Sequence, residues 1–307
     1  MRIVFLGTSA FACPALRALA EAHDIALVIT QPDRPAGRKR ELKPPPVKIT
    51  SLDLGLPIAQ PERINSEEGI ALLKKAEPEA IVVASYGQFL GTKVFSLPPH
   101  GTINIHASIL PRYRGAAPIN WAIIRGETET GVTTFFIEKG MDSGEILVQR
   151  TCPIGPDETA GELHDRLSEL GAEAILETLR SIEDGTARPT PQREEEATLA
   201  PKLSRADGQI DWAVSARDIH NLVRGLNPWP GAFTHLESET VKIHRAALSS
   251  IGCGEIEPGS VALQETGRLL VGTGDELIEV LEIQREGRPR TSGRAFLNGL
   301  RGEARFS

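Results

Sequence analysis

Cysteine is scarce in this chain of 307 residues. Its three cysteines, Cys13, Cys152 and Cys253, lie far apart and are odd in number. A disulfide framework or a cysteine zinc site needs more cysteines at closer and more regular spacing, so the sequence argues against both. This cysteine content fits a reducing compartment, and we expect a cytoplasmic protein.

Long hydrophobic runs are absent as well. No apolar stretch approaches the roughly 20 residues that a helix needs to cross a bilayer, so we expect no membrane partner. The first residues, MRIVFLGTSAF, contain one arginine and a short apolar run, which predicts a strand rather than a signal peptide. The turn after this strand has a single glycine. Neither GxGxxG nor a P-loop motif is present, which argues against dinucleotide and P-loop sites.

An excess of positive charge is also missing. The net charge of −7 argues against a generally basic nucleic-acid binder, although it leaves local patches open. Residues 32–48 are the exception, with five prolines, no hydrophobic period and a net charge of +5 between Arg34 and Lys48. The cations there are Arg34, Arg38, Lys39, Arg40, Lys43 and Lys48. This segment is either a solvated loop or a mobile basic clamp for a polyanion.

The order of the predicted elements indicates an α/β fold. An apolar strand at 2–7, a helix after Ser9 and a second apolar strand at 24–31 are typical of a parallel sheet with crossover helices. Further strands are predicted at 79–85, 101–108, 130–138 and 144–153, and further helices at 46–54, 65–76, 115–125 and 157–183.

Two polar residues on the strand at 101–108 are the main candidates for chemistry. Residues two apart in a strand point to the same face, so Asn104 and His106 project side by side. The amide of Asn104 offers hydrogen-bond donors, and the ring of His106 gains or loses a proton near neutral pH. Together they could stabilise an oxygen that becomes negative and manage a proton beside it. The alternative is that both are polar residues at a strand end, satisfied by the backbone.

Two loops are candidates for the rim of such a site. The strand at 79–85 runs into a glycine-containing stretch, and a loop of this kind often borders a pocket at the carboxyl edge of an open sheet. Its residues are Tyr86, Gly87, Gln88, Phe89 and Leu90. Asp142 lies in a tight turn between Gly140 and Gly144. It is either a turn aspartate that bonds its own backbone or a carboxylate presented to the site.

The composition changes after residue 184. Residues 185–207 contain three prolines and the acidic run Glu194–Glu196, which is typical of an interdomain linker. Beyond them, short apolar runs are separated by glycine turns at near-regular spacing, which predicts a small barrel or sandwich. We therefore predict an α/β domain at 1–184, a linker at 185–207 and a β domain at 208–307.

Several stretches resemble the family of methionyl-tRNA formyltransferases, over nearly the whole chain. They are QPDRPAGR at 31–38, NIHASILPRYRGAAP at 104–118, GMDSGEIL at 140–147, KLSRADGQIDW at 202–212 and NPWP at 227–230. The pattern Asn-x-His-x-Ser-x-x-Pro with a later Asp is shared by the wider folate-dependent formyltransferases, so it indicates the chemistry and leaves the acceptor open. The basic loop, the linker motif and NPWP point to a tRNA acceptor.

This resemblance implies a Rossmann-like formyltransferase domain with a mostly parallel sheet, followed by a small OB-like β-barrel that binds tRNA. It implies transfer of a formyl group from 10-formyltetrahydrofolate to the amine of initiator methionyl-tRNA, without a metal. In that reaction Asn104 and His106 would stabilise the oxyanion, and Asp142 would orient His106 or accept a proton.

The resemblance also implies binding residues and partners. Folate would be held by Ser108, Ile109, Leu110 and Pro111 together with Tyr86, Gly87, Gln88, Phe89 and Leu90. The tRNA would be held by Arg34, Arg38, Lys39, Arg40 and Lys43. We expect a monomer whose partners are initiator methionyl-tRNA and folate.

Three other functions remain open at this point. A formyltransferase for another amine, such as a sugar nucleotide or a glycinamide ribonucleotide, would keep Asn104, His106 and Asp142 without needing the basic loop. A hydrolase that releases formate would use the same three residues with water in place of the amine. A non-catalytic RNA-binding module would have no need to keep the three residues intact.

Overall fold

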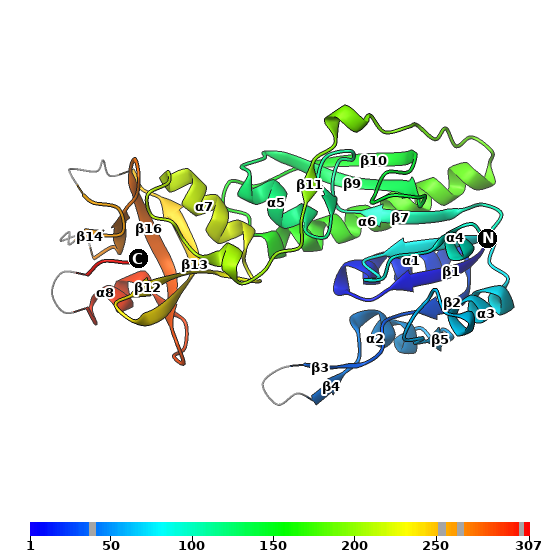
Figure 1. Ribbon diagram of the computed structural model, residues 1–307, viewed down its shortest axis with the longest axis horizontal. Coiled ribbons are helices and arrows are strands. Elements are labelled where there is room, and N and C mark those ends of the chain that lie inside the picture. The colour runs from blue at the N-terminus through cyan, green and yellow to red at the C-terminus, as the bar shows by residue number, and fades with distance from the viewer. Residues whose placement is uncertain (37–40, 251–255, 263–266, 301–303) are drawn as a thin grey trace. The chain divides into compact units, whose positions relative to one another are not determined.

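The structure is a computed structural model that describes residues 1–36, 41–250, 256–262, 267–300 and 304–307 (Figure 1). Contacts divide the chain into two compact units, and neither unit is continuous in sequence. Unit 1 holds Met1–Gly115, Thr130–Cys152 and His164–Leu199, and unit 2 holds Ala116–Glu129, Pro153–Leu163 and Ala200–Ser307. The predicted boundaries at 184 and 207 stay a prediction, while two segments from before residue 184 pack within unit 2.

Unit 1 is built on a seven-stranded sheet in the order β10-β9-β7-β6-β1-β2-β5. Its parallel strands are β1 (Arg2–Gly7), β2 (Asp24–Ile29), β5 (Ile58–Ala59), β6 (Ala80–Ala84) and β7 (Thr102–His106). β9 (Glu129–Phe136) pairs antiparallel with β7, and β10 (Ile146–Pro153) lies beyond it at the edge. The central strand β6 is buried along its whole length, as is typical of parallel sheets. The predicted α/β fold with a mostly parallel sheet is confirmed.

The helices of unit 1 connect or follow these strands. They are α1 (Cys13–Ala22), preceded by a 3-10 turn at Ala10–Ala12, α2 (Pro46–Asp53), α3 (Glu67–Ala76), α4 (Thr92–Phe95) and α6 (Ala160–Glu183), whose first residues, up to Leu163, belong to unit 2. The start of α3 shows how the sequence sets a helix end, because the Ser66 hydroxyl accepts a hydrogen bond from the Gly69 N–H at 3.2 Å. Acidic residues fill its first turn and lysines its last, as the helix dipole favours. Within the described ranges, no helix is long and apolar enough to cross a membrane.

The sheet reverses its strand order at β1, which has β2 on one side and β6 on the other. The carboxyl ends of β1 and β6 therefore lie next to each other. After these ends, the Thr8 hydroxyl donates to the Tyr86 carbonyl oxygen at 2.7 Å, and the Ser9 hydroxyl bonds that of Ser85 at 2.8 Å. Open α/β sheets bind ligands outside the carboxyl ends of the strands at such a reversal, so a site is expected at this edge.

The basic segment at 32–48 has more secondary structure than the sequence predicted. Arg34–Ala36 (β3) and Glu41–Lys43 (β4) pair as antiparallel strands, which stand away from the large sheet in Figure 1. The expectation of a loop without secondary structure is wrong for these residues, because backbone pairing does not require a hydrophobic period. Arg38, Lys39 and Arg40 lie outside the described residues.

The predicted linker at 185–207 is docked on unit 1 over part of its length. Thr190 and Ile146 exchange two backbone hydrogen bonds of 2.8 and 2.9 Å, and the Arg114 N–H donates to the Thr198 carbonyl oxygen at 2.8 Å. β11 (Leu199–Ala200) then pairs with β8 (Arg114–Gly115). The acidic run forms a 3-10 turn at Glu194–Glu196. This segment is therefore an ordered part of the fold, which its composition did not indicate.

Unit 2 contains an antiparallel sheet in the order β12-β13-β16-β15-β14, with β17 paired to β16. Its strands are β12 (Ala232–Leu236), β13 (Glu239–Leu248), β14 (Val261–Ala262), β15 (Leu270–Gly272), β16 (Leu277–Arg285) and β17 (Thr291–Ser292). Its helices are α5 (Pro118–Ile124), α7 (Ala216–Gly225) and α8 (Gly293–Leu297), and a 3-10 turn spans Ala206–Gly208.

The sheet of unit 2 curls, and residues 304–307 pair with both of its edges. Ser307 and His235 of β12 exchange two backbone hydrogen bonds of 2.9 Å, and the Val261 N–H of β14 donates to the Ala304 carbonyl oxygen at 2.9 Å. Pairing at both edges leaves few backbone groups open to another chain. The Phe306 ring lies in the interior and stacks on Trp212, with 5.7 Å between the ring centroids. The predicted small β-barrel is confirmed.

Helix α6 begins with a capping box. The Thr159 hydroxyl accepts a hydrogen bond from the Glu162 N–H at 3.2 Å, and the Glu162 carboxylate accepts one from the Thr159 N–H at 2.8 Å. Arg245 donates to the same carboxylate at 2.7 Å. The bonds from the backbone and hydroxyl of Thr159, followed by the bond from Arg245, lower the pKa of Glu162 to about 2.

We expect Glu162→Gln to lower the free energy of unfolding by about 0.5 kcal/mol at pH 7, a small value because the half-exposed carboxylate is screened by water. Glutamine still bonds the Thr159 N–H, so the substitution removes mainly the charge. Since the folded pKa lies below the unfolded value of 4.5, this stabilisation is complete above pH 4.5 and is lost as the pH falls toward 2. Calorimetry of both proteins at pH 7 and pH 3 measures it. A difference that does not shrink at pH 3 would contradict a charge effect.

Candidate functional site

Asn104 and His106 lie on β7, at the carboxyl edge of the sheet. Asn104 pairs with Val83 of the parallel neighbour β6, and His106 pairs with Thr133 of the antiparallel neighbour β9. The strand alternation places both side chains on one face, as the sequence predicted. His106 is buried and Asn104 half-buried. No hydrogen bond of the Asn104 side chain occurs within the described residues, so its amide donors are available to a ligand.

The hydrogen bond of His106 determines where its ring carries a proton. Its Nε2 lies 2.9 Å from the Tyr113 carbonyl oxygen. A carbonyl oxygen only accepts, so Nε2 is the protonated nitrogen that donates. In the neutral ring, Nδ1 then has a lone pair, and it lies 3.8 Å from Oδ2 of Asp142. Nδ1 is therefore the ring atom that is free to accept a proton, and it faces the Asp142 carboxylate.

Asp142 occupies a turn with left-handed backbone, at φ of +48°. Its Oδ2 accepts a hydrogen bond from the Gly115 N–H at 2.8 Å, so the carboxylate is held by a different loop rather than by its own turn. The turn needs glycine at position 144, because a Cβ there would collide with the Phe136 carbonyl oxygen. The structure thus brings Asp142 and His106 together, and their catalytic roles stay a prediction.

The stretch of Ser108, Ile109, Leu110 and Pro111 forms a tight turn after β7. The Ser108 hydroxyl donates to the Arg112 carbonyl oxygen at 2.6 Å. Gln149 Nε2 donates to the Leu110 carbonyl oxygen at 2.7 Å and so fixes the turn from β10. The hydroxyl hydrogen of Ser108 is used within the turn, and folate binding by these residues stays a prediction.

The stretch of Tyr86, Gly87, Gln88, Phe89 and Leu90 is fixed to the segment before α3. Asn65 Nδ2 donates to the Phe89 carbonyl oxygen at 2.8 Å, and Asn65 Oδ1 accepts from the Gly91 N–H at 2.7 Å. The Gln88 side chain accepts from a backbone N–H at 2.9 Å. Leu90 is buried, whereas the Phe89 side chain is 70% exposed. Phe89 is thus the large apolar side chain that this stretch exposes, and its contact with folate stays a prediction.

Tyr86 differs from its neighbours because its ring is buried in the apolar core beside β1 and β6. Among the described residues, its hydroxyl has no hydrogen-bond partner. Burial raises the pKa of Tyr86 to about 12. A buried hydroxyl without a partner is costly, so the Tyr86 hydroxyl is an unsatisfied polar group in an apolar core.

Of the predicted tRNA-binding cations, the structure describes Arg34 and Lys43, which belong to the paired strands β3 and β4. Arg34 Nη2 donates to Glu62 at 3.0 Å on the surface, and Lys43 is exposed on β4. Lys48 bonds Asp33 at 2.8 Å, and this bond is the main cause that lowers the pKa of the Asp33 carboxyl. Arg38, Lys39 and Arg40 fall outside the described residues, so their role stays a prediction.

Three residues beside the turn of Asp142 were not singled out from the sequence. They are Arg114, Gln192 and Glu194. Arg114 is part of the NIHASILPRYRGAAP stretch and Glu194 is part of the acidic run, but no local pattern links positions 78 to 80 residues apart. The sequence signal for this cluster is the acidic run, because one of its carboxylates pairs with the buried Arg114.

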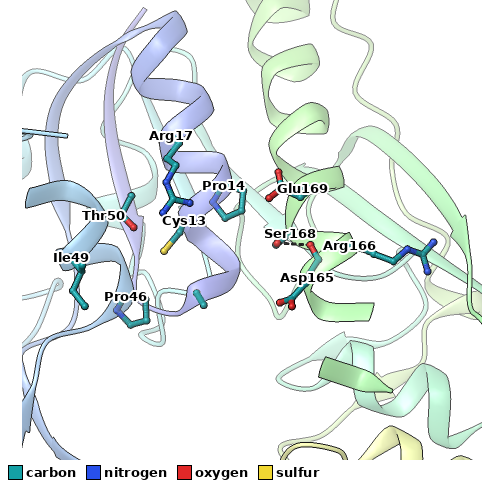
Figure 2. A pocket seen from close by; sticks show the side chains of 11 residues that line it. Cys13, Pro14, Arg17, Pro46, Ile49, Thr50, Asp165, Arg166, Ser168 and Glu169 are labelled. Atoms are coloured by element: carbon teal, nitrogen blue, oxygen red, sulfur yellow. Dashed lines mark hydrogen bonds between the residues drawn. The ribbon is translucent and has the colours of Figure 1, made fainter. Parts of the chain in front are cut away.

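A cavity of about 610 Å³ is lined by three helices of unit 1 (Figure 2). Figure 2 shows Cys13 and Arg17 from α1, Ile49 from α2, and Asp165 and Glu169 from α6 around it. None of the predicted site residues lines this cavity, so it is not the predicted folate pocket. Its charges are mixed and do not define one class of ligand.

Within the described residues, no group of three or more His, Cys, Asp or Glu side chains is arranged to hold a metal ion. The candidate catalytic side chains Asn104, His106 and Asp142 are an amide, an imidazole and a carboxylate. This set suits acyl transfer, in which an oxygen gains negative charge while a nucleophile loses a proton.

Two family models match the chain. The model described as "Formyl transferase" matches residues 1–179, and "Formyl transferase, C-terminal domain" matches residues 202–301. A protein of Geobacter metallireducens named "Methionyl-tRNA formyltransferase" is 46% identical over 98% of this chain and 96% of its own. A protein of Koribacter versatilis with the same name is 48% identical over 98% and 96%.

Solved structures share the fold at low sequence identity. The N-formyltransferase from Helicobacter canadensis, in complex with folinic acid and dTDP-3-aminofucose, aligns with a TM-score of 0.68 at 17% identity, over 93% of this chain and 99% of its own. HypX from Aquifex aeolicus in complex with tetrahydrofolic acid aligns with a TM-score of 0.65 at 20% identity, over 97% of this chain and 47% of its own. At these identities the likeness concerns the fold.

We expect Tyr86→Phe to leave the free energy of unfolding unchanged or to raise it by up to about 1 kcal/mol, because the substitution removes a buried hydroxyl that has no protein partner. Denaturant unfolding of both proteins without ligand tests this. A loss above about 1 kcal/mol would show that the hydroxyl has a stabilising partner such as a buried water.

Proposed function

Because the chain belongs to the formyl transferase family, we propose that it transfers the formyl group of 10-formyltetrahydrofolate to the amine of initiator methionyl-tRNA. The product, N-formylmethionyl-tRNA, serves translation initiation. The observation that carries the proposal is the 46–48% identity to methionyl-tRNA formyltransferases over 98% of the chain, since it extends across both units. The enzyme acts in the cytoplasm as a monomer, with folate and tRNA as its partners.

We place the folate at the carboxyl edge of the sheet, where the strand order reverses. Residues after β6 and β7 would hold it, with the exposed ring of Phe89 as a stacking surface and the buried hydroxyl of Tyr86 as a polar contact. Bound 10-formyltetrahydrofolate supplies an activated formyl group. The turn of Ser108, Ile109, Leu110 and Pro111 contributes shape and backbone groups, because the Ser108 hydroxyl is already used.

The three polar side chains have separate tasks in this reaction. The Asn104 amide donates to the oxygen that gains negative charge as the amine attacks. His106 would keep its proton on Nε2 through Tyr113 and take up the proton of the attacking amine on Nδ1. It would return this proton to the tetrahydrofolate nitrogen as the bond between that nitrogen and the formyl carbon breaks, which releases tetrahydrofolate. Asp142, at 3.8 Å from Nδ1, stabilises the ring in its charged form.

The acceptor can be tested directly. The purified protein is incubated with 10-formyltetrahydrofolate and either methionyl-tRNA, a dTDP-amino sugar, glycinamide ribonucleotide or no amine. Formylmethionine on the tRNA, without comparable product from the two small amines, is expected. Formylation of a small amine alone would show that this amine, rather than methionyl-tRNA, is the acceptor. Formate release without an amine would indicate a hydrolase.

We expect His106→Ala to lower kcat by about 10²–10³, because it removes the proton carrier beside Asn104. His100→Ala, which changes an exposed histidine in the turn before β7, serves as the matched control. Binding of folate and the circular dichroism spectrum should stay as in the wild type. Turnover of His106→Ala within about threefold of the control would exclude His106 from the mechanism.

Substituting Arg38, Lys39 and Arg40 together by alanine should weaken tRNA binding and spare folate binding, because the sequence places +5 between Arg34 and Lys48 in a chain of −7. Each lost phosphate contact flattens the plot of log affinity against log salt by about 0.7–0.9, so three lost contacts change the slope by about two to three. Lys74→Ala with Lys75→Ala on α3 is the control for charge alone. Unchanged affinity and slope in the triple variant would make the loop a simple connection.

A further inference from the structure

We propose that Gln192 is a positioning residue for formyl transfer, which fixes the turn that presents Asp142 to His106. The inference rests on the proposed function and on the role that it gives to Asp142. Gln192 comes from the segment that the sequence predicted to be a linker, far from either residue in the chain. It touches no reacting atom, and its effect passes through the backbone of the turn.

The side-chain amide of Gln192 uses all of its hydrogen-bonding capacity. Its Nε2 donates to the carbonyl oxygens of Asp142 and Gly144, both at 2.8 Å. Its Oε1 accepts from Arg114 Nε at 3.1 Å and from Arg114 Nη2 at 2.7 Å. An amide has two N–H hydrogens and two oxygen lone pairs, so all of its hydrogen-bonding groups are used here. The single atom Nε2 holds the carbonyl oxygens of both Asp142 and Gly144.

Arg114 and Glu194 fix the orientation of this amide. The Arg114 guanidinium is buried, and it donates to both carboxylate oxygens of Glu194 at 2.8 and 2.9 Å. The bond from Arg114 is the main cause that lowers the pKa of the Glu194 carboxyl. A guanidinium only donates, so the Gln192 oxygen must face it and the Gln192 nitrogen must face the turn.

These contacts form a closed ring around Asp142. Its carbonyl oxygen is held through Gln192 and Arg114, and its carboxylate is held by the N–H of Gly115, the residue next to Arg114. Asp142 has a left-handed backbone that a non-glycine residue seldom adopts without such restraints. Removing the Gln192 amide opens the ring and frees the turn to relax. The carboxylate then loses its defined distance of 3.8 Å to His106.

The kinetic test uses Gln192→Ala, with Arg193→Ala as the matched control. Arg193 is the next residue, and its guanidinium makes an exposed ion pair with Glu196. We expect Gln192→Ala to lower kcat by about 10–100-fold with KM for folate and tRNA within about twofold, because the effect lies in positioning. Gln192→Glu keeps the acceptor for Arg114 and loses both donors, so it should also lower kcat while KM stays nearly unchanged. A normal kcat in both Gln192 variants would overturn the proposal.

A double-mutant cycle separates positioning from general damage. If Gln192 acts through the carboxylate of Asp142, then adding Gln192→Ala to Asp142→Asn should change kcat by less than about threefold. Independent losses that multiply would show that Gln192 supports the fold rather than Asp142. Both outcomes require that Asp142→Asn alone lowers kcat, and a normal Asp142→Asn enzyme would overturn the proposal as well.

A measurement without turnover tells this proposal apart from the proposed function. Lys139 is exposed at the start of the turn, so trypsin cleavage after it reports how firmly the turn is held. We expect faster cleavage in Gln192→Ala than in wild type or Arg193→Ala, followed by mass spectrometry of the fragments. Faster cleavage in a protein that formylates no tRNA would refute the function and leave the restraint standing. Equal cleavage rates would refute the restraint.

Discussion

The parallel hydrogen bonding of β1, β6 and β7 is the constraint on which the site depends. Parallel strands end at the same edge, so the segments that follow β6 and β7 meet there although they come from separate parts of the chain. The antiparallel partner β9 adds Thr133, whose hydroxyl donates to the Ser108 carbonyl oxygen at 2.7 Å and accepts from the Leu110 N–H. The positions of Asn104 and His106 are thus set by the sheet, while Asp142 reaches His106 from a turn.

Burial limits the hydrogen bonds that the polar groups at this edge can make, and so fixes their tautomer or orientation. The His106 ring is almost enclosed, and its one backbone acceptor selects a single neutral tautomer. In the neutral ring, the bond to the Tyr113 carbonyl oxygen means that the nitrogen facing Asp142 is the one with the lone pair. An exposed histidine would populate both forms, and part of the molecules would present the wrong nitrogen. In the same way, the buried Arg114 fixes which end of the Gln192 amide faces the turn.

The sequence predicted much of the fold because most elements carry a local signal. The alternation in β7, the cap at Ser66 and the apolar run of β6 each depend on neighbours in the chain, and each element lies where it was expected. The same alternation placed Asn104 and His106 on one face. What the sequence did not show depends on distant partners. The pairing of β3 with β4, and of residues 304–307 with both edges of the sheet in unit 2, follow from backbone contacts that leave no periodic pattern in the sequence.

The candidate site divides in the same way. Asp142 was predicted from its motif, yet its hydrogen bond to Gly115 and its distance to His106 are properties of the folded chain. The acidic run was predicted to be part of a linker because of its composition. Composition describes a segment as a whole and not the partner of any single residue. In the structure one of its carboxylates has a buried cation as its partner. Composition alone does not distinguish a solvated acidic residue from one that neutralises an arginine.

Unit 2 consists of three separate segments of the chain, so it cannot be transferred to another protein as one continuous gene fragment. Arg224 on α7 is buried, and its guanidinium donates to the carbonyl oxygens of Gly155 and Glu158 at 3.1 and 3.2 Å. The Asn120 side chain of α5 donates to the Gly225 carbonyl oxygen at 2.7 Å. A gene fragment that begins at Ala200 would carry the barrel and leave these partners behind. Such a fragment, grafted onto another protein, would bring a desolvated cation without its acceptors, so a functional chimera must inherit three separate pieces of the chain.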